Sequence, residues 1–249
     1  MEHLSLNGAW SLYQQDVPTP IPATVPGCVH LDLLASGSLA DPFFRDNELQ
    51  QMWVGETDWR YERNFTVTPA LLAHERVLLR CFGLDTLATI EVNGQRVGSA
   101  DNMFRTWEFD VKPHLQAGDN RISIALAAPM PFARRMDAEK GNMAGWVEPM
   151  RINSGAWIRK EPCNFGWDWG PKMVTSGIWR DIEVMAFDSG RLTDVQILQQ
   201  HSPQQVTLTL NLAAEGSTAL TASVHHERWA DGGVSSAARR WQAARHRST

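Results

Sequence analysis

The sequence predicts an all-β protein built as an antiparallel β-sandwich, and three observations support this. In residues 59–67 the apolar side chains fall mostly on odd-numbered positions, the period of two typical of a strand with one buried face. Residues 121–127 alternate in the same way. Asn93-Gly94 follows the apolar stretch 86–92 and is a strong hairpin signal. Many short strands joined by turns indicate a sandwich.

The other elements can be placed in chain order. Residues 4–12 predict a short opening strand with a turn at Asn7-Gly8, and closely spaced prolines then keep the chain extended as far as Gly27. Residues 30–35 fit one or two helical turns, whereas 41–55 are irregular and are expected to pack over the sheet. Further strands are expected at 75–82, 107–111 and 178–187, and the return strand of the hairpin begins at Arg96.

A long excursion between Pro129 and Gly177 carries several tryptophans and few strand signals. Long irregular segments inside compact domains are usually functional or disordered, and the aromatic content argues against disorder. The excursion is therefore interpreted as the wall of a site.

The most unusual part of this excursion is the run 162–171, PCNFGWDWGP, in which Trp167 and Trp169 flank Asp168. An exposed indole costs hydrophobic free energy unless something covers it. Sugars suit such a loop, because their C–H faces pack on aromatic rings and their hydroxyls donate to a carboxylate. The alternative is that both tryptophans plug the core while Asp168 caps a turn. The local chemistry alone favours neither interpretation.

The composition excludes several classes of function. Hydrophobic residues make up 43% of the 249 residues and charged ones 20%, which is typical of a soluble globular chain. Eleven tryptophans against two tyrosines suggest a surface that recognises flat apolar faces, as carbohydrate-binding surfaces do. The net charge of -5 argues against nucleic acid or an anionic membrane as the main partner.

The cysteines and the N-terminus bear on metal binding and location. Cys28, Cys81 and Cys163 are widely spaced and odd in number, so neither a metal site nor a disulfide framework is indicated, and no cofactor is expected. The first residues lack a basic region followed by an apolar core, and no apolar run approaches the length of a membrane span. We therefore expect a cytoplasmic protein with reduced thiols.

Several charged residues outside the loop carry weaker expectations. His30 has no partner spacing for a metal and is expected at the surface or in a turn. Glu56 and Asp58 are expected to pair with nearby arginines, Arg60 or Arg63. Arg159 and Lys160, just before the loop, are placed to steer its geometry.

The strand pattern restarts after residue 190. Three segments, 194–199, 205–213 and 219–225, predict strands of a second and smaller domain, which three strands cannot complete. Residues 232–249 form a basic, Ala/Arg-rich tail that is expected to be disordered. A loss of reading frame near Gly232 would account for both features.

Eight short motifs occur in an order typical of one enzyme family. They are Leu6–Trp10 (LNGAW), Val25–His30 (VPGCVH), Asp41–Glu48 (DPFFRDNE), Trp59–Tyr61 (WRY), Gly83–Thr86 (GLDT), Val92–Gly94 (VNG), Asn102–Arg105 (NMFR) and Phe165–Pro171 (FGWDWGP). Together they resemble the N-terminal part of β-mannosidases in glycoside hydrolase family 2. Each motif is weak, but their order over residues 4–187 is specific, and WDWGP points to the β-mannosidase branch.

The resemblance implies a domain plan. Residues 1–190 would be the jelly-roll, galactose-binding-like sandwich, 191–231 an incomplete immunoglobulin-like sandwich, and 232–249 the tail. In the family a TIM barrel follows and carries two catalytic glutamates. This chain ends before any barrel, so no catalytic residue is expected in it and no hydrolysis by the chain alone. Asn47-Glu48 matches the dipeptide of the family's acid/base glutamate, but it lies in the non-catalytic domain, where we expect it to fix a loop by hydrogen bonds.

The resemblance also implies a role for the loop. Trp167 and Trp169 would shape the wall of the terminal-mannose subsite, and Asp168 would accept hydrogen bonds from sugar hydroxyls. The implied partners are a β-mannoside glycan and the barrel of the same polypeptide. Two other classes remain as alternatives: a stand-alone carbohydrate-binding module with a complete binding surface, and a structural sandwich that binds proteins. In the second of these, Asp168 could be replaced without any effect on sugar recognition.

Overall fold

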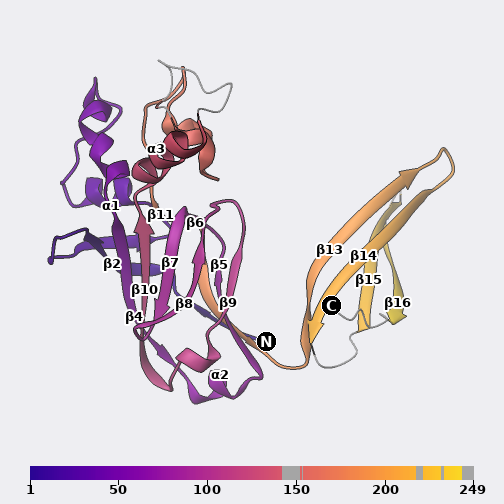
Figure 1. Cartoon of the computed structure of the whole chain (residues 1–249). Coiled ribbons are helices and arrows are strands. Elements are labelled where there is room, and N and C mark those ends of the chain that lie inside the picture. The colour runs from indigo at the N-terminus through magenta and orange to yellow at the C-terminus, as the bar shows by residue number, and fades with distance from the viewer. Residues whose placement is uncertain (142–151, 153, 217–220, 231–232, 243–249) are drawn as a thin grey trace. The chain divides into compact units, whose positions relative to one another are not determined.

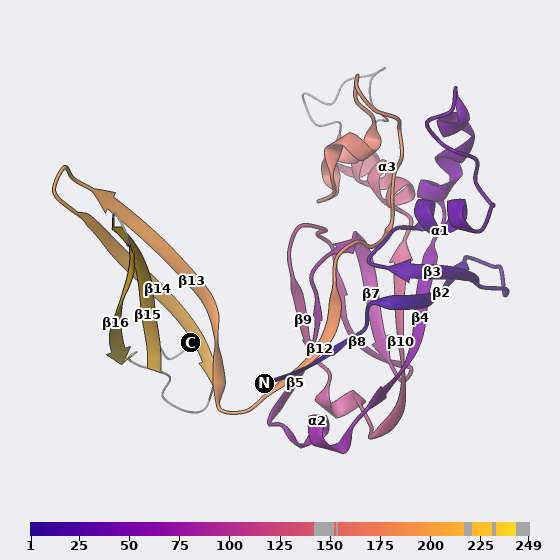
Figure 2. The same cartoon turned by 180° about the vertical axis from the view of Figure 1, so that it is seen from behind.

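A computed structural model describes residues 1–141, 152, 154–216, 221–230 and 233–242, the last two ranges by their backbone (Figures 1 and 2). The chain divides into two compact units, Met1–Ala186 and Phe187–Thr249. The structure is mostly strands in sheets, which confirms the predicted all-β class. None of the described helices is both long and apolar enough to cross a membrane.

The first unit is a sandwich of a four-stranded and a six-stranded sheet. The smaller sheet has the order β1 (Glu2–Ser5), β12 (Ile182–Phe187), β5 (Arg76–Cys81), β9 (Trp107–Asp110). The larger has the order β3 (Ile21–Val25), β2 (Gly8–Gln14), β4 (Trp59–Val67), β10 (Gly118–Ala127), β7 (Leu87–Val92), β8 (Gln95–Ala100). A short antiparallel pair joins β6 (Leu84–Asp85) to β11 (Gly177–Ile178).

The alternation seen in the sequence sorts side chains into the core. In β4, Trp59 and Tyr61 are fully buried, and the Trp59 indole donates to the Val54 carbonyl at 3.0 Å. In β10, Ile122 and Ile124 point into the same core. Burying a large apolar side chain contributes roughly 1.5–3 kcal/mol, so these central strands anchor the fold.

The predicted hairpin between β7 and β8 is confirmed. Asn93 and Gly94 both have positive φ, 52° and 78°, as a two-residue type I′ turn requires. The Asn93 side chain also accepts a hydrogen bond from the Arg121 amide at 2.9 Å, which ties the turn to β10.

Helical segments gather at the two ends of the sandwich. They are α1 (Val29–Ala35), η1 (Asn47–Glu56), α2 (Pro69–Ala73), η2 (Lys112–His114), α3 (Pro129–Lys140), η3 (Gly155–Trp157) and η4 (Pro162–Phe165). Figure 1 shows α1 and α3 at one end and α2 at the opposite end. The sequence did not predict α3, because its first turn contains prolines. Proline is tolerated in a first turn, where the backbone N–H has no helical partner.

The second unit contains two antiparallel pairs, β13 (Gly190–His201) with β14 (Val206–Gly216) and β15 (Thr221–Ala230) with β16 (Gly233–Gln242). The tail 232–249 was predicted to be disordered from its composition, but β16 occupies 233–242. Its register with β15 runs from Thr221↔Gln242 to Ala230↔Gly233 without a break. The sequence between these strands is Asp231-Gly232, a hairpin signal that the compositional argument overlooked. The rest of the tail, 243–249, lies outside the described residues.

At Gly177 the backbone lies close to the backbone of Gly27 and Cys28. A Cβ at this position would lie 2.6 Å from the Gly27 carbonyl oxygen and 2.7 Å from Cys28 Cα. Because backbone cannot rotate away, we expect Gly177→Ala to lower the free energy of unfolding by about 1–3 kcal/mol in urea denaturation.

Gly170→Ala is the matched control for this prediction, since a Cβ there meets no atom within 4 Å. It should change the free energy of unfolding by less than about 0.5 kcal/mol. Equal effects of the two substitutions would contradict the packing argument.

Candidate functional site

The Trp-Asp-Trp segment forms a tight exposed turn between η4 and β11. A backbone bridge joins Trp167 to Gly170, which leaves Asp168 and Trp169 at the tip. The two indole rings lie 4.9 Å apart between centroids, with their planes tilted by 46°. Trp169 is 74% exposed, so it does not plug the core. The Asp168 carboxylate is exposed and has no hydrogen-bond or ion-pair partner in the described part of the chain.

The turn stands on a small apolar cluster of its own. Phe165 is fully buried against Met130 of α3, Ile158 and Val174. The Ile152 amide donates to the Phe165 carbonyl at 2.6 Å, which fixes the backbone just before the turn. The turn is therefore presented from a packed base rather than from a free loop.

Glu48 of η1 holds the chain just after the turn, and its neighbour Asn47 holds the loop before η1. The Lys172 amide donates to Glu48 Oε2 at 2.8 Å, and the Asn47 side chain donates to the Asp41 carbonyl at 2.8 Å. Both contacts confirm the expectation that Asn47 and Glu48 fix loops by hydrogen bonds.

A buried polar cluster lies where the loop leaves and rejoins the sandwich. Lys160 Nζ lies 2.5 Å from Asp85 Oδ2 and donates to Thr175 Oγ1 at 2.8 Å. Thr175 Oγ1 also lies 2.7 Å from Asp85 Oδ2. Sequence reasoning had singled out Lys160 but missed Asp85 and Thr175. The sequence signal at Asp85 was a carboxylate within a largely apolar stretch, which does not identify its partners.

His30, in α1, lies next to this cluster. It is only 4% exposed, so the expectation that it sits at the surface or in a turn was wrong. Burial, and then the positive charge of Lys160, lower the pKa of His30 to about 4, while Asp85 acts in the opposite direction. The imidazole is therefore neutral near neutral pH. Its Nδ1 has no hydrogen-bond partner within the described ranges.

The expected surface pairing of Glu56 and Asp58 was also wrong. Glu56 binds Arg134 of α3, with Nη1 2.7 Å from Oε1. Asp58 Oδ1 accepts from the Ala128 amide at 2.7 Å, just before α3 begins. Because α3 was not predicted, these partners could not be identified from the sequence. Arg60 instead stacks on Tyr13, with its Cζ 4.7 Å from the ring centroid.

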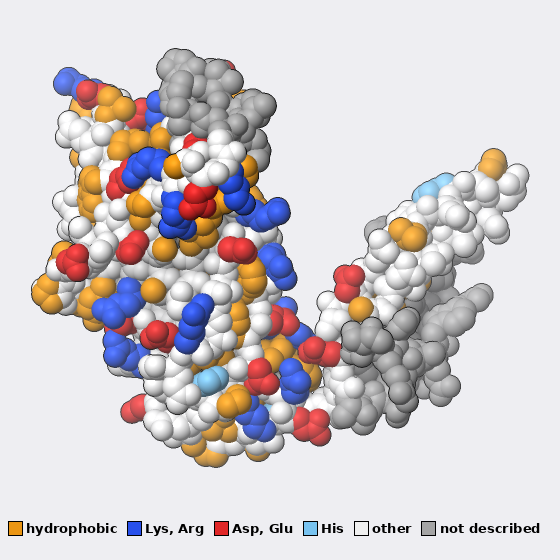
Figure 3. Space-filling model, viewed as in Figure 1, with side chains coloured by type: hydrophobic (Ala, Val, Ile, Leu, Met, Phe, Trp, Pro, Cys, Tyr) orange, Lys and Arg blue, Asp and Glu red, His pale blue; other side chains and the backbone are white. Residues whose placement is uncertain are grey.

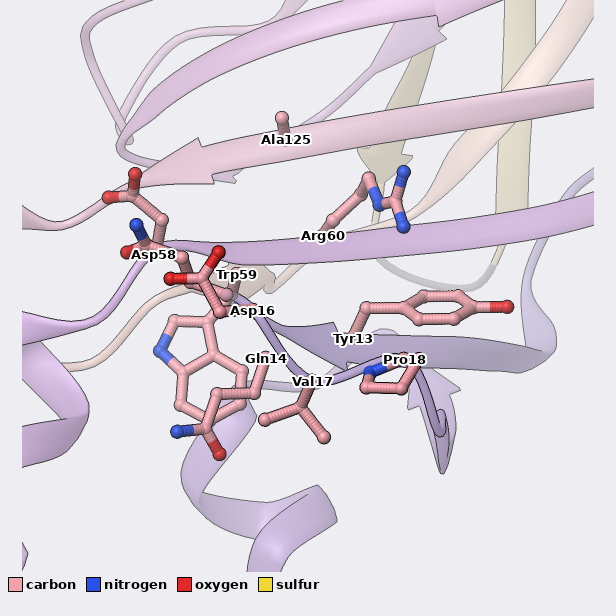
Figure 4. A pocket seen from close by; sticks show the side chains of 10 residues that line it. Tyr13, Gln14, Asp16, Val17, Pro18, Asp58, Trp59, Arg60 and Ala125 are labelled. Carbon is pink, nitrogen blue, oxygen red and sulfur yellow. The ribbon is translucent and has the colours of Figure 1, made fainter.

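Two hollows in the described surface lie apart from the turn. One depression of about 420 Å³ lies between β2 and β4 and is lined by Tyr13, Asp16, Pro18, Asp58 and Arg60, among others (Figure 4). Figure 4 shows the Tyr13 ring beside Pro18. No residue of the Trp-Asp-Trp turn contributes to it. The described residues of the Trp-Asp-Trp turn thus form an exposed wall.

Within the described ranges, metal-ligating groups give no competing site. Figure 3 shows acidic and basic side chains interspersed over the face in view. Across the described ranges, no group of three or more His, Cys, Asp or Glu residues lies close enough together to hold a metal ion.

Comparison with known proteins places this geometry in a family. Residues 10–180 match the family described as glycosyl hydrolase 2 galactose-binding domain-like. The chain belongs to this family. The bovine (Bos taurus) β-mannosidase is 34% identical over 192 residues, which is 74% of this chain and 22% of that protein. β-Mannosidase B of Aspergillus clavatus is 32% identical over 241 residues, covering 90% of this chain and 28% of that protein.

A solved structure to which this chain is similar is also that of a β-mannosidase. The crystal structure of a β-D-mannosidase from Dictyoglomus thermophilum matches 97% of this chain and 30% of its own, with a TM-score of 0.83 and 32% identity. The β-glucuronidase of Bifidobacterium dentium has a TM-score of 0.64 at 17% identity over 98% of this chain and 40% of its own, and shares the fold alone. The chain thus corresponds to the N-terminal domain of glycoside hydrolase family 2 β-mannosidase-like proteins, and spans about a quarter of the length of these curated relatives.

Proposed function

We propose that this chain is the non-catalytic N-terminal portion of a β-mannosidase that removes terminal β-linked mannose with retention. The observation that carries the proposal is the turn 167–170, in which an exposed carboxylate, with no partner among the described residues, lies beside two exposed or half-buried indoles on a packed base. The relatives named above, which are themselves β-mannosidases, support the substrate class.

The chemistry of the turn suits one side of a sugar subsite. The indole faces offer flat apolar surface for the C–H face of a pyranose ring. The Asp168 carboxylate is suited to accept hydrogen bonds from sugar hydroxyls, and a hydrogen bond to a charged group contributes about 1.5–3 kcal/mol. Hydroxyl orientation distinguishes mannose from its epimers, so this contact helps to select the sugar.

The bond-breaking groups are assigned to a different part of the polypeptide. A retaining glycosidase needs two carboxyl groups about 5 Å apart across the scissile bond. Glu48, which matches the family's dipeptide, already accepts the Lys172 amide and serves as a brace. The partners of this domain are therefore a β-mannoside glycan and a barrel of the same polypeptide that supplies the two glutamates.

Asp168→Asn tests this role in a chain extended through the downstream coding sequence. We expect kcat/KM for a chromogenic β-mannoside to fall by about 10- to 100-fold, because the amide loses the charge that strengthens the hydrogen bonds. Steady-state kinetics on purified protein measures this.

Asp16→Asn is the control, because Asp16 is also exposed but lines the separate depression between β2 and β4. It should leave kcat/KM unchanged. If the Asp168 variant keeps full activity, the Trp-Asp-Trp turn does not contact the sugar and the proposal fails.

A further inference from the structure

The two stems of the Trp-Asp-Trp loop meet at a single buried carboxylate. Lys160 precedes the loop and Thr175 follows it, and both side chains reach the same atom, Asp85 Oδ2, at 2.5 and 2.7 Å. They also contact each other at 2.8 Å. Asp85 belongs to β6 of the sandwich, far away in the sequence. We call Asp85, Lys160 and Thr175 the stem clip.

The donors and acceptors of the stem clip form one hydrogen-bonded network. Lys160 has only donors, so it gives hydrogen bonds to the Asp85 carboxylate and to the Thr175 oxygen. The Thr175 hydroxyl has one hydrogen, and the carboxylate is a stronger acceptor than the Asn164 amide oxygen at 3.1 Å. The other carboxylate oxygen, Oδ1, accepts from the Thr86 hydroxyl. The carboxylate thus binds both loop stems and the residue that follows it in the chain.

Because these charges are buried, the stem clip requires precise hydrogen-bond geometry. Lys160 is 3% exposed and Asp85 2%. A charge so far from water is tolerated only with well-placed partners, and well-packed apolar side chains often give equal or greater stability. A buried ion pair is therefore weak evidence for stability alone. What it does supply is geometry, because each partner must stay within hydrogen-bond distance.

We propose that Asp85, through Lys160 and Thr175, is the positioning residue that sets how the Trp167–Gly170 turn is presented. This inference rests on the proposed function, in which that turn contacts the sugar. Asp85 does not touch the substrate. It fixes the distance between the loop stems, and the packed base at Phe165 carries that geometry to the tip.

The test compares Thr175→Val with Thr175→Ser by hydrogen–deuterium exchange of the 249-residue chain. Valine keeps the shape but removes the hydroxyl, whereas serine keeps it. Protected amides in the loop include those of Asn164, Gly166 and Lys172, which all donate hydrogen bonds. In the valine variant we expect exchange over 162–172 to accelerate about tenfold, with β10 unchanged. The serine variant should restore slow exchange.

Two further variants keep the test decisive. Asp85→Asn should accelerate loop exchange more strongly than Thr175→Val; if it fails to fold, the valine and serine pair decides. Arg134→Met removes the ion pair with Glu56, which lies outside the loop stems, and should leave exchange over 162–172 unchanged.

Three results would overturn the inference: no change over 162–172 in the valine variant, equal acceleration of the loop and β10, or no rescue by serine. This measurement requires no sugar. If the exchange result contradicts the role of the stem clip, the proposed sugar contact of Asp168 is unaffected. That contact is tested separately, by the kinetic assay of Asp168→Asn.

Discussion

Phe165→Ala is expected to lower the free energy of unfolding by about 3–5 kcal/mol. Phe165 is 0% exposed and packs against Met130, Ile158 and Val174. Truncation removes the buried ring and leaves a cavity, and the surrounding loop and α3 can close it only partly. Urea denaturation of the 249-residue chain, followed by far-ultraviolet circular dichroism, measures the change.

Phe104→Ala is the matched control, since that ring is 50% exposed. Its removal should change the free energy of unfolding by less than about 1 kcal/mol. If the two substitutions cost the same, the cluster at Phe165 does not form the base of the turn.

The buried imidazole of His30 predicts that stability falls as the solution is acidified. An unfolded histidine has a pKa of about 6.5, whereas in the folded chain burial and Lys160 lower the pKa of His30 to about 4. Between these values the unfolded chain binds a proton that the folded chain does not. The contribution of His30 to the free energy of unfolding is therefore fully present above about pH 6.5. It is lost as the pH falls towards 4, which lowers the free energy of unfolding by about 3 kcal/mol.

His30→Asn separates this contribution from those of other groups. Asparagine does not titrate, so the variant should be less stable at neutral pH but should show a flatter dependence between pH 7 and 4.5. Asp32, whose pKa is raised by burial, contributes to both proteins alike and cancels in the comparison. Parallel pH curves for the two proteins would show that His30 is not the group responsible.

Much of the sandwich could be predicted because its strands obey local rules. The alternation in 59–67 coincides with β4 (Trp59–Val67), and the Asn93-Gly94 signal gave the turn between β7 and β8. In both cases the information lies within a few neighbouring residues. The resemblance then added what local patterns cannot provide, namely the family and the loop to examine.

The missed features depend on contacts between distant segments. Nothing near Asp85 in the sequence shows that Lys160 and Thr175 will meet its carboxylate, because only the pairing of β6 with β11 brings the three together. Helix α3 was hidden by its prolines, and with it the Glu56–Arg134 ion pair. His30 was expected at the surface because the charged groups near it, Lys160 and Asp85, come from other segments rather than from its neighbours in the chain.

The most direct test of the central claim is hydrolysis of a chromogenic β-mannoside by this chain and by a version extended through the downstream coding sequence. We predict activity in the extended protein alone, with the matching β-glucoside hydrolysed far more slowly. Hydrolysis by the 249-residue chain itself would contradict the assignment of this domain as non-catalytic, and an inactive extended protein would contradict the assignment to a β-mannosidase.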